Sequence, residues 1–299
     1  MNIKTLLCHA TLLCTVFATI AAPSAFSQNT QATTGITSPD QQIAGLDNNL
    51  EEGWWSSKPK ESKMLYTTVA AATVIGLYGL AEWDYGSGGL HSADEGWFGS
   101  DSKYGGADKM GHFWSTYAFS DALTALYKSW GYAPAKANNY GALSAWTVQF
   151  IMELGDATSE TQGFSYEDVV MNTIGALTSV LLDRYPELDR KIDFRFEYVH
   201  EVDYNNFFDD YSNQFYSVVL KLDGFDYIEN TFLKYIEFQA GYYSRGYDTD
   251  EVEKKRAVYA GIGFNFSRLL NQNGWEKTGR VLEYIQVPYT VPKVSHDLD

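Results

Sequence analysis

The pattern of apolar and polar positions changes near residue 186, and this change predicts two kinds of structure. Before it, apolar residues recur at helical spacing in four long segments, at 62–83, 108–130, 138–156 and 166–184. After it, apolar and polar residues alternate with a period of two, which is typical of half-buried strands. We therefore predict an α+β fold: an N-terminal bundle of about four apolar helices followed by a small antiparallel β-rich C-terminal region.

The first helical segment has two interpretations. No charged residue lies between Lys63 and Glu82, so the segment is about as long as a bilayer span. Its many Ala, Thr and Gly residues make it weakly apolar, and a helix buried in a globular bundle has the same composition. The pair Trp54 and Trp55 just before it fits a membrane interface and equally fits a cap on a soluble core.

The C-terminal alternation separates two faces along each predicted strand. In the segment 192–200, the apolar Ile192, Phe194 and Phe196 alternate with charged residues. Similar segments lie at 214–222, 234–242 and 257–266, and we expect a fifth at 280–291 whose end is weakened by Pro288. A lipid-facing barrel wall has the same alternation. Four or five strands cannot close such a barrel, so we predict a twisted sheet packed on or beside the helices.

The N-terminal segment predicts export. Lys4, an apolar run and the small residues Ala25 and Ser27 form a secretory signal, with cleavage expected before Gln28. Both cysteines, Cys8 and Cys14, lie within it, so the mature chain has no thiol chemistry. A non-cleaved anchor and lipidation at Cys14 are the alternatives. We divide the chain into a signal peptide (1–27), a flexible polar lead-in (28–60), a helical module (61–186) and an antiparallel β-rich region (187–299).

The mature chain is strongly acidic. Removal of the signal takes away one of the 22 basic residues and none of the 38 acidic ones, so the net charge becomes 21 − 38 = −17. Phosphate backbones repel such a chain, which argues against nucleic-acid binding. We expect a membrane or an envelope protein as partner. Export places the protein in the bacterial cell envelope, in the periplasm or at the outer membrane.

Three polar pairs interrupt the apolar helices. Asp108 and His112 are four residues apart, Glu153 and Asp156 three, and Asp168 and Asn172 four, so each pair shares one helix face. Buried ionised groups need partners, and the pairs are explained together if they meet. Separately, Asp108 could be an N-cap, Ser165 and Asp168 a capping box, and Glu153 with Asp156 a solvated helix end.

Two chemistries suit such a cluster. Carboxylates with an amide favour a divalent cation such as Mg²⁺, Mn²⁺ or Ca²⁺, although the sequence requires none. The candidate metal ligands are Asp108, His112, Glu153, Asp156 and Asp168. Without a metal, Asp108 could orient His112 as a general base, with Glu153 and Asp168 as further candidate catalytic groups. The sequence contains no nucleophile motif, P-loop or dinucleotide fingerprint.

The ordered set of polar residues carries a resemblance. The segments "DKMGHFWSTYAFSDAL", "FIMELGD" and "GFSYEDVVMNTIGAL" resemble the YfiM-like family of uncharacterised bacterial envelope proteins and, more distantly, VanZ-like membrane proteins. The resemblance covers about half of the chain. The matching positions are Asp108, Lys109, His112, Glu153, Ser165, Asp168, Asn172 and Gly175. The resemblance implies a helical envelope module of unknown activity, in which Lys109, Ser165, Asn172 and Gly175 belong to the polar cluster.

Three functions are open to the chain on this evidence. The first is a non-enzymatic, membrane-associated envelope protein whose polar cluster locks the helix packing. The second is a hydrolase of a lipid-linked or cell-wall substrate that uses His112 and the carboxylates. The third is a module that binds a divalent cation or a small envelope ligand.

Overall fold

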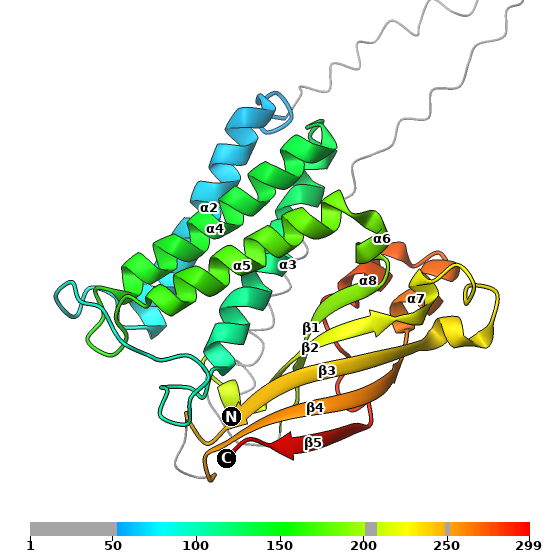
Figure 1. The fold of residues 1–299 in the computed structure, drawn as a ribbon. Helices are drawn as coiled ribbons and strands as arrows, with labels where there is room; N and C mark the ends of the chain where they lie inside the picture. The colour runs from blue at the N-terminus through cyan, green and yellow to red at the C-terminus, as the bar shows by residue number, and fades with distance from the viewer. Residues whose placement is uncertain (1–52, 201–207, 249–251) are drawn as a thin grey trace, which may run out of the picture.

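The computed structural model describes residues 53–200, 208–248 and 252–299 and separates a helical half from a sheet (Figure 1). The predicted signal peptide, its cleavage site and most of the predicted lead-in lie outside the described residues. The α+β prediction is confirmed, because four long helices precede a five-stranded antiparallel sheet.

The four long helices are those that the apolar spacing predicts. They are α2 (Lys60–Glu82), α3 (Ala107–Ser129), α4 (Pro134–Asp156) and α5 (Tyr166–Arg184). The bounds of α5 match the prediction at both ends. Helix α4 begins four residues before the predicted start, at Pro134, because a proline fits the first turn of a helix, where its missing N–H is not needed.

Helix α3 lies between its neighbours and packs on both α4 and α5. Its core residues Leu123 and Tyr127 are almost fully buried, together with Ala145 of α4. Helix α2 packs against α4, and most of its side chains remain exposed. The outer surface of the bundle is therefore formed largely by α2, α4 and α5.

The sheet follows the chain order β1-β2-β3-β4-β5, with every neighbour antiparallel. Its strands are β1 (Ile192–Tyr198), β2 (Gln214–Lys221), β3 (Ile236–Arg245), β4 (Lys255–Phe264) and β5 (Lys293–Asp297). A short helix, α6 (Pro186–Asp189), links the bundle to β1. Helices α7 (Phe266–Gln272) and α8 (Glu276–Val281) precede β5.

The predicted fifth strand at 280–291 is wrong. Its start belongs to α8, and the rest is irregular apart from one bridge between Ile285 and Phe196. Pro288 cannot donate a ladder hydrogen bond, and Tyr289 has a φ of 62°, so neither continues an extended strand. The true edge strand begins at Lys293 and pairs with β4.

The two faces of the sheet are inverted relative to an ordinary soluble sheet. Its exposed face carries Val218, Leu220, Phe238, Val258, Ile262 and Val294, each at least 38% exposed. Its covered face buries charged and polar side chains, among them Asp193, Arg195, Lys221, Glu237 and Gln239. The period of two thus holds as predicted, but in β1, β2 and β3 the side that carries the charged residues is the buried one.

Helix α3 joins the two halves through aromatic contacts with β1. The ring centroids of Phe113 and Phe194 lie 5.0 Å apart, and those of Trp114 and Phe196 lie 4.9 Å apart. The Trp114 indole also donates to the carbonyl of Tyr284 at 3.0 Å. The sheet therefore packs beside the bundle, as the alternation predicts.

Candidate functional site

One end of the helical bundle collects the polar residues that interrupt its apolar helices. The site lies where α3 and α5 begin and α4 ends, so the antiparallel arrangement brings residues from three helices together. Asp108, Lys109, Glu153, Asp168 and Asn172 are each at most 3% exposed. The structure thus brings together residues from all three predicted pairs.

Lys109 is the centre of this cluster and is fully buried. Its Nζ donates to Asp108 Oδ2 and Glu95 Oε2, both at 2.7 Å, and to Asp168 Oδ2 at 2.9 Å. The Ser165 hydroxyl lies 3.4 Å away. A buried ammonium requires such partners, and its three carboxylates come from a loop and two helices. Lys109 therefore ties α3 to α5 and to the loop that precedes α3.

Glu95 and Lys103 lie outside the set of site residues that the sequence predicts. Glu95 lies in the loop before α3 and accepts from Lys103 Nζ at 3.0 Å as well as from Lys109. Lys103 also donates to Gln162 Oε1 at 2.7 Å. Periodicity could not find these residues because the loop has none. The only sequence signal was the unusual length of the loop.

His112 lies between two carboxylates on the side of the cluster away from Lys109. Its Nδ1 is 3.6 Å from Glu153 Oε1, and its Nε2 is 3.7 Å from Asp168 Oδ1. Both oxygens are buried and accept no hydrogen bond, although Lys109 Nζ lies 2.9 Å from the Asp168 oxygen. The His112 side chain is 14% exposed, so it is the accessible member of the three.

Asn172 holds the imidazole in place. Its Oδ1 lies 3.2 Å from His112 Nδ1 and accepts from the Thr116 hydroxyl at 2.8 Å. Among the described residues, no hydrogen bond joins Asp108 to His112, because Asp108 is engaged by Lys109. The proposed orientation of His112 by Asp108 is therefore wrong, and Asn172 occupies the orienting position.

The sequence also allowed a separate local role for each polar pair: an N-cap, a capping box and a solvated helix end. Asp108 is not an N-cap, since Gly106 caps α3 in a left-handed conformation (φ 86°). Half of the capping box is confirmed: Ser165 Oγ accepts from the Asp168 N–H at 3.3 Å, but the Ser165 N–H donates to Glu153 Oε2 at 3.4 Å and not to Asp168. Glu153 is 1% exposed, which excludes a solvated helix end for this residue. Capping and clustering therefore coexist at Asp168.

Asp156 and Glu167 extend the site. Asp156 is half-buried and interacts with the hydroxyl of Tyr85, which also donates to the Met152 carbonyl at 3.1 Å. Glu167 is fully buried at the start of α5 and accepts from Ser165 Oγ at 3.2 Å. Six carboxyl groups thus converge on this end of the bundle, against two lysines and one histidine. They are Glu95, Asp108, Glu153, Asp156, Glu167 and Asp168.

The excess of carboxyl groups shifts their protonation. Burial raises the pKa of Glu153 to about 8 and that of Asp156 to about 7, and neighbouring carboxylates add to both shifts. Burial also raises the pKa of Asp108 to about 6 against the opposing effect of Lys109. At Glu95 burial acts the same way, but Lys109 and Lys103 outweigh it and lower the pKa to about 2. The ammonium groups therefore neutralise one side of the site more than the other.

Gly175 allows α3 and α5 to approach each other beside the site. A Cβ at this position would lie 2.3 Å from the Phe113 carbonyl oxygen. Such contacts are too short for any side chain, so the glycine permits the close crossing that brings Asp168 and Asn172 to α3. Its place in the resembling motif has this physical explanation.

Two overlapping sets of metal-ligand atoms exist in the described part of the chain. One consists of His112, Glu153 and Asp168, and the other of Glu95, Asp108 and Asp168. Lys109 Nζ lies within 2.9 Å of all three carboxylates of the second set. The ammonium therefore occupies the position that a cation would take there.

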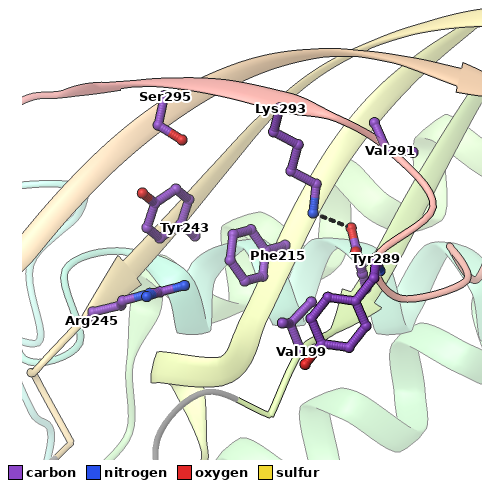
Figure 2. A pocket seen from close by; sticks show the side chains of 9 residues that line it. Val199, Phe215, Tyr243, Arg245, Tyr289, Val291, Lys293 and Ser295 are labelled. Atoms are coloured by element: carbon purple, nitrogen blue, oxygen red, sulfur yellow. Dashed lines mark hydrogen bonds and ion pairs between the residues drawn. The ribbon is translucent and has the colours of Figure 1, made fainter.

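A separate pocket lies on the covered face of the sheet (Figure 2). Lys293 points into it and pairs with Glu197, and its Nζ lies 4.4 Å from the centroid of the Phe215 ring. The Arg245 guanidinium stacks near Tyr243 at 5.1 Å. Glu197, the acidic residue of this pocket, pairs with Lys293, so the pocket lacks the carboxylate excess of the bundle site.

Comparison with known proteins gives one family. Residues 94–184, which contain the whole cluster, match the family DUF2279, described as a predicted periplasmic lipoprotein. No curated protein and no solved structure matches the chain. The chain is an exported protein of the bacterial cell envelope, as its N-terminal segment predicts.

Proposed function

We propose that the protein is a membrane-associated envelope protein whose helical bundle lies against lipid through α2, α4 and α5. The observation that carries this proposal is the exposure of α2. It is the one helix in the described residues that is long and apolar enough to cross a membrane, and within it Leu77 is 61% and Leu80 63% exposed. A soluble bundle would bury such a helix.

The neighbouring helices extend this apolar surface. On α4, Leu143 is 59% exposed and Leu154 48%, and on α5, Leu177 is 62% exposed. Single exposed leucines are ordinary, but rows of them along adjacent helices form a continuous patch, which typically binds a membrane or a protein. Lipid is the occupant we favour, because the charge-free length of α2 matches a bilayer span.

Aromatic and basic residues at the far end of the bundle support the same orientation. The ring centroids of Trp54 and Trp55 lie 6.1 Å apart, and those of Trp55 and Trp130 lie 5.9 Å apart. Lys60 and Lys63 lie in the first turn of α2 at this end. Tryptophan and lysine concentrate at membrane interfaces. The cluster at the opposite end would then face the aqueous side or the other interface.

Carbonate extraction of membranes tests the proposal. The wild-type protein should stay in the membrane fraction, whereas a Leu65→Ser, Leu77→Ser, Leu80→Ser triple variant should be released. Tyr227→Ser is the matched control, because Tyr227 is 80% exposed but lies outside the bundle. Release of the wild-type protein, or retention of the triple variant, would contradict membrane contact through α2.

A lipid anchor is the competing explanation for membrane retention. The family description names lipoproteins, which supports lipidation at Cys14. Cys14→Ser should release an anchored protein while leaving α2 intact, so the two variants distinguish the mechanisms. If only Cys14→Ser releases the protein, the anchor alone accounts for retention.

The finer relationship to YfiM-like and VanZ-like proteins is part of the same proposal. It rests on the order of the motif residues along the chain. These residues lie together in one cluster at the end of the bundle. Hydrolysis of a lipid-linked or cell-wall substrate is the alternative function, supported by the partly exposed His112 between two carboxylates. Folded His112→Ala and Glu153→Gln proteins that still complement a deletion strain would exclude it.

A further inference from the structure

We propose that His112, Glu153 and Asp168 bind a divalent metal ion that accepts nitrogen and oxygen ligands, of the Mn²⁺ or Zn²⁺ type. This inference goes beyond membrane association and does not depend on it. One ligand atom from each of the three side chains lies within 4.8 Å of the other two. Imidazole with carboxylates is a donor set that suits these ions.

The first supporting observation is the unused bonding capacity of the Glu153 carboxylate. Glu153 is 1% exposed, and its Oε1 accepts no hydrogen bond. Asp168 Oδ1 lies 2.9 Å from Lys109 Nζ, so this oxygen already has one cationic neighbour. Buried polar atoms are ordinarily satisfied, so a buried carboxylate oxygen 3.6 Å from an imidazole needs an explanation. A cation beside His112 would satisfy Glu153 Oε1.

The second observation is the orientation of the imidazole. With Asn172 Oδ1 3.2 Å from it, Nδ1 carries a ring hydrogen, and in the neutral imidazole Nε2 then presents its lone pair toward Asp168. Metal-bound histidines commonly donate their other N–H to such a partner. The separation of 3.7 Å between Nε2 and Asp168 Oδ1 is close to the roughly 3.0–3.6 Å between two atoms that share an ion at about 2.1 Å.

The neighbouring triad provides an internal comparison. It shares Asp168, but Lys109 fills it at 2.7–2.9 Å from all three carboxylates. No lysine or arginine reaches Glu153 in the described part of the chain. Lys109 therefore serves the first triad, and in the second it reaches only the shared Asp168 and not Glu153.

The competing arrangement is a protonated His112 that bridges Glu153 and Asp168. In that case both N–H groups would point at carboxylates, but the contacts of 3.6 and 3.7 Å are longer than charge-assisted hydrogen bonds of about 2.7–2.9 Å. Asn172 Oδ1 accepts from the Nδ1–H group in both arrangements, so this contact does not separate them. This arrangement needs no metal, so metal binding distinguishes the two.

Titration of the metal-stripped full-length protein with Mn²⁺ or Zn²⁺ tests the proposal, with Mg²⁺ and Ca²⁺ as comparison ions. We expect about one ion bound per chain and a saturable rise in Tm on the order of 5 °C at a hundredfold excess over Kd. Loss of the electron-paramagnetic signal of free Mn²⁺ measures binding without reference to stability. X-ray absorption spectra at the zinc edge should show a histidine ligand.

Matched variants locate the ion. Glu153→Gln and His112→Ala should abolish both the Tm rise and Mn²⁺ uptake, whereas Glu95→Gln, in the triad filled by Lys109, should retain them. If a variant fails to fold, spectroscopy of the wild-type protein still decides. No binding by folded wild-type protein overturns the proposal, as does binding that survives Glu153→Gln or that is lost only in Glu95→Gln.

Discussion

The bundle end and the covered face of the sheet both bury charged side chains beneath apolar surfaces, but they balance those charges differently. In the sheet, the ion pairs join three acidic residues to three basic ones, Asp193, Glu197 and Glu237 to Arg195, Lys221 and Lys293, and Glu283 is a fourth carboxyl group near Lys221. At the bundle end, six carboxyl groups meet only Lys103, Lys109 and His112. The sheet network is therefore closer to charge balance than the bundle site.

This difference separates a structural network from a candidate binding site. Buried ion pairs are costly to desolvate, and a balanced set recovers that cost through mutual attraction. The sheet also contains buried atoms without hydrogen bonds, such as Arg195 Nε and Glu237 Oε2, so such atoms alone do not indicate a ligand. The larger excess of carboxyl groups over cationic side chains, together with such an oxygen on Glu153, distinguishes the bundle end.

Removal of the Lys109 ammonium should lower the free energy of unfolding more than any other change considered, and it is the strongest test of the difference between the two regions. Lys109→Met leaves Asp108 and Asp168 without an ammonium and Glu95 with Lys103 alone. Breaking a buried pair typically costs about 3–5 kcal/mol, and we expect a loss at the upper end of that range. Urea unfolding of both proteins measures it.

Arg195→Met is the matched change in the sheet. Asp193 keeps Lys221 as a partner, so only Glu237 loses its cation, and the loss in stability should be smaller than for Lys109→Met. Lys128→Met, in an exposed pair with Asp183, should cost less than about 1 kcal/mol. Equal losses for Lys109 and Arg195 would show that charge balance does not distinguish the two regions.

The sequence predicted the fold and most of the site for identifiable reasons. The spacing of apolar residues located α5 to the residue, and the polar pairs on three helices led to His112, Glu153 and Asp168. Glu95 was missed because its loop has no period and its role depends on a contact 14 residues away. Alternation located strands β1 to β4 but could not show that the charged face of β1, β2 and β3 is the buried one.

The next test introduces a side chain where α3 crosses α5, and we expect a smaller loss of stability than for Lys109→Met. The Cβ of Gly175→Ala would lie 2.3 Å from the Phe113 carbonyl, so α5 must move away from α3 and from Lys109. Overpacking of this kind costs roughly 2–3 kcal/mol. Because only the bundle site depends on this crossing, calorimetry should show a lower Tm together with weaker Mn²⁺ uptake.

Gly76→Ala on α2 is the control for this prediction. Nothing lies within 4 Å of a Cβ at that position, so alanine should be neutral or stabilise the helix by roughly 0.5–1 kcal/mol. A Gly175→Ala protein as stable as the Gly76→Ala protein would contradict the close crossing of α3 and α5.

The smallest effect concerns Asp121, which links the two regions. Its carboxylate accepts from Ser179 Oγ of α5 at 2.6 Å and from the Tyr284 hydroxyl, before β5, at 3.2 Å. Burial raises its pKa to about 6 despite these hydrogen bonds, compared with 3.8 for an ordinary aspartate. The folded protein therefore binds a proton more tightly than the unfolded chain does.

The sign of the resulting pH dependence follows from that difference. The contribution of Asp121 is fully present below about pH 4 and is lost as pH rises through about 6, because ionisation is then easier in the unfolded state. Asp121→Asn removes this titration, so the stability difference between variant and wild type should change by on the order of 1–2 kcal/mol between pH 4 and 6. Other groups titrate equally in both proteins, and the difference isolates Asp121. A difference that is constant with pH would mean that this carboxylate is solvated and does not join α3 to the segment before β5.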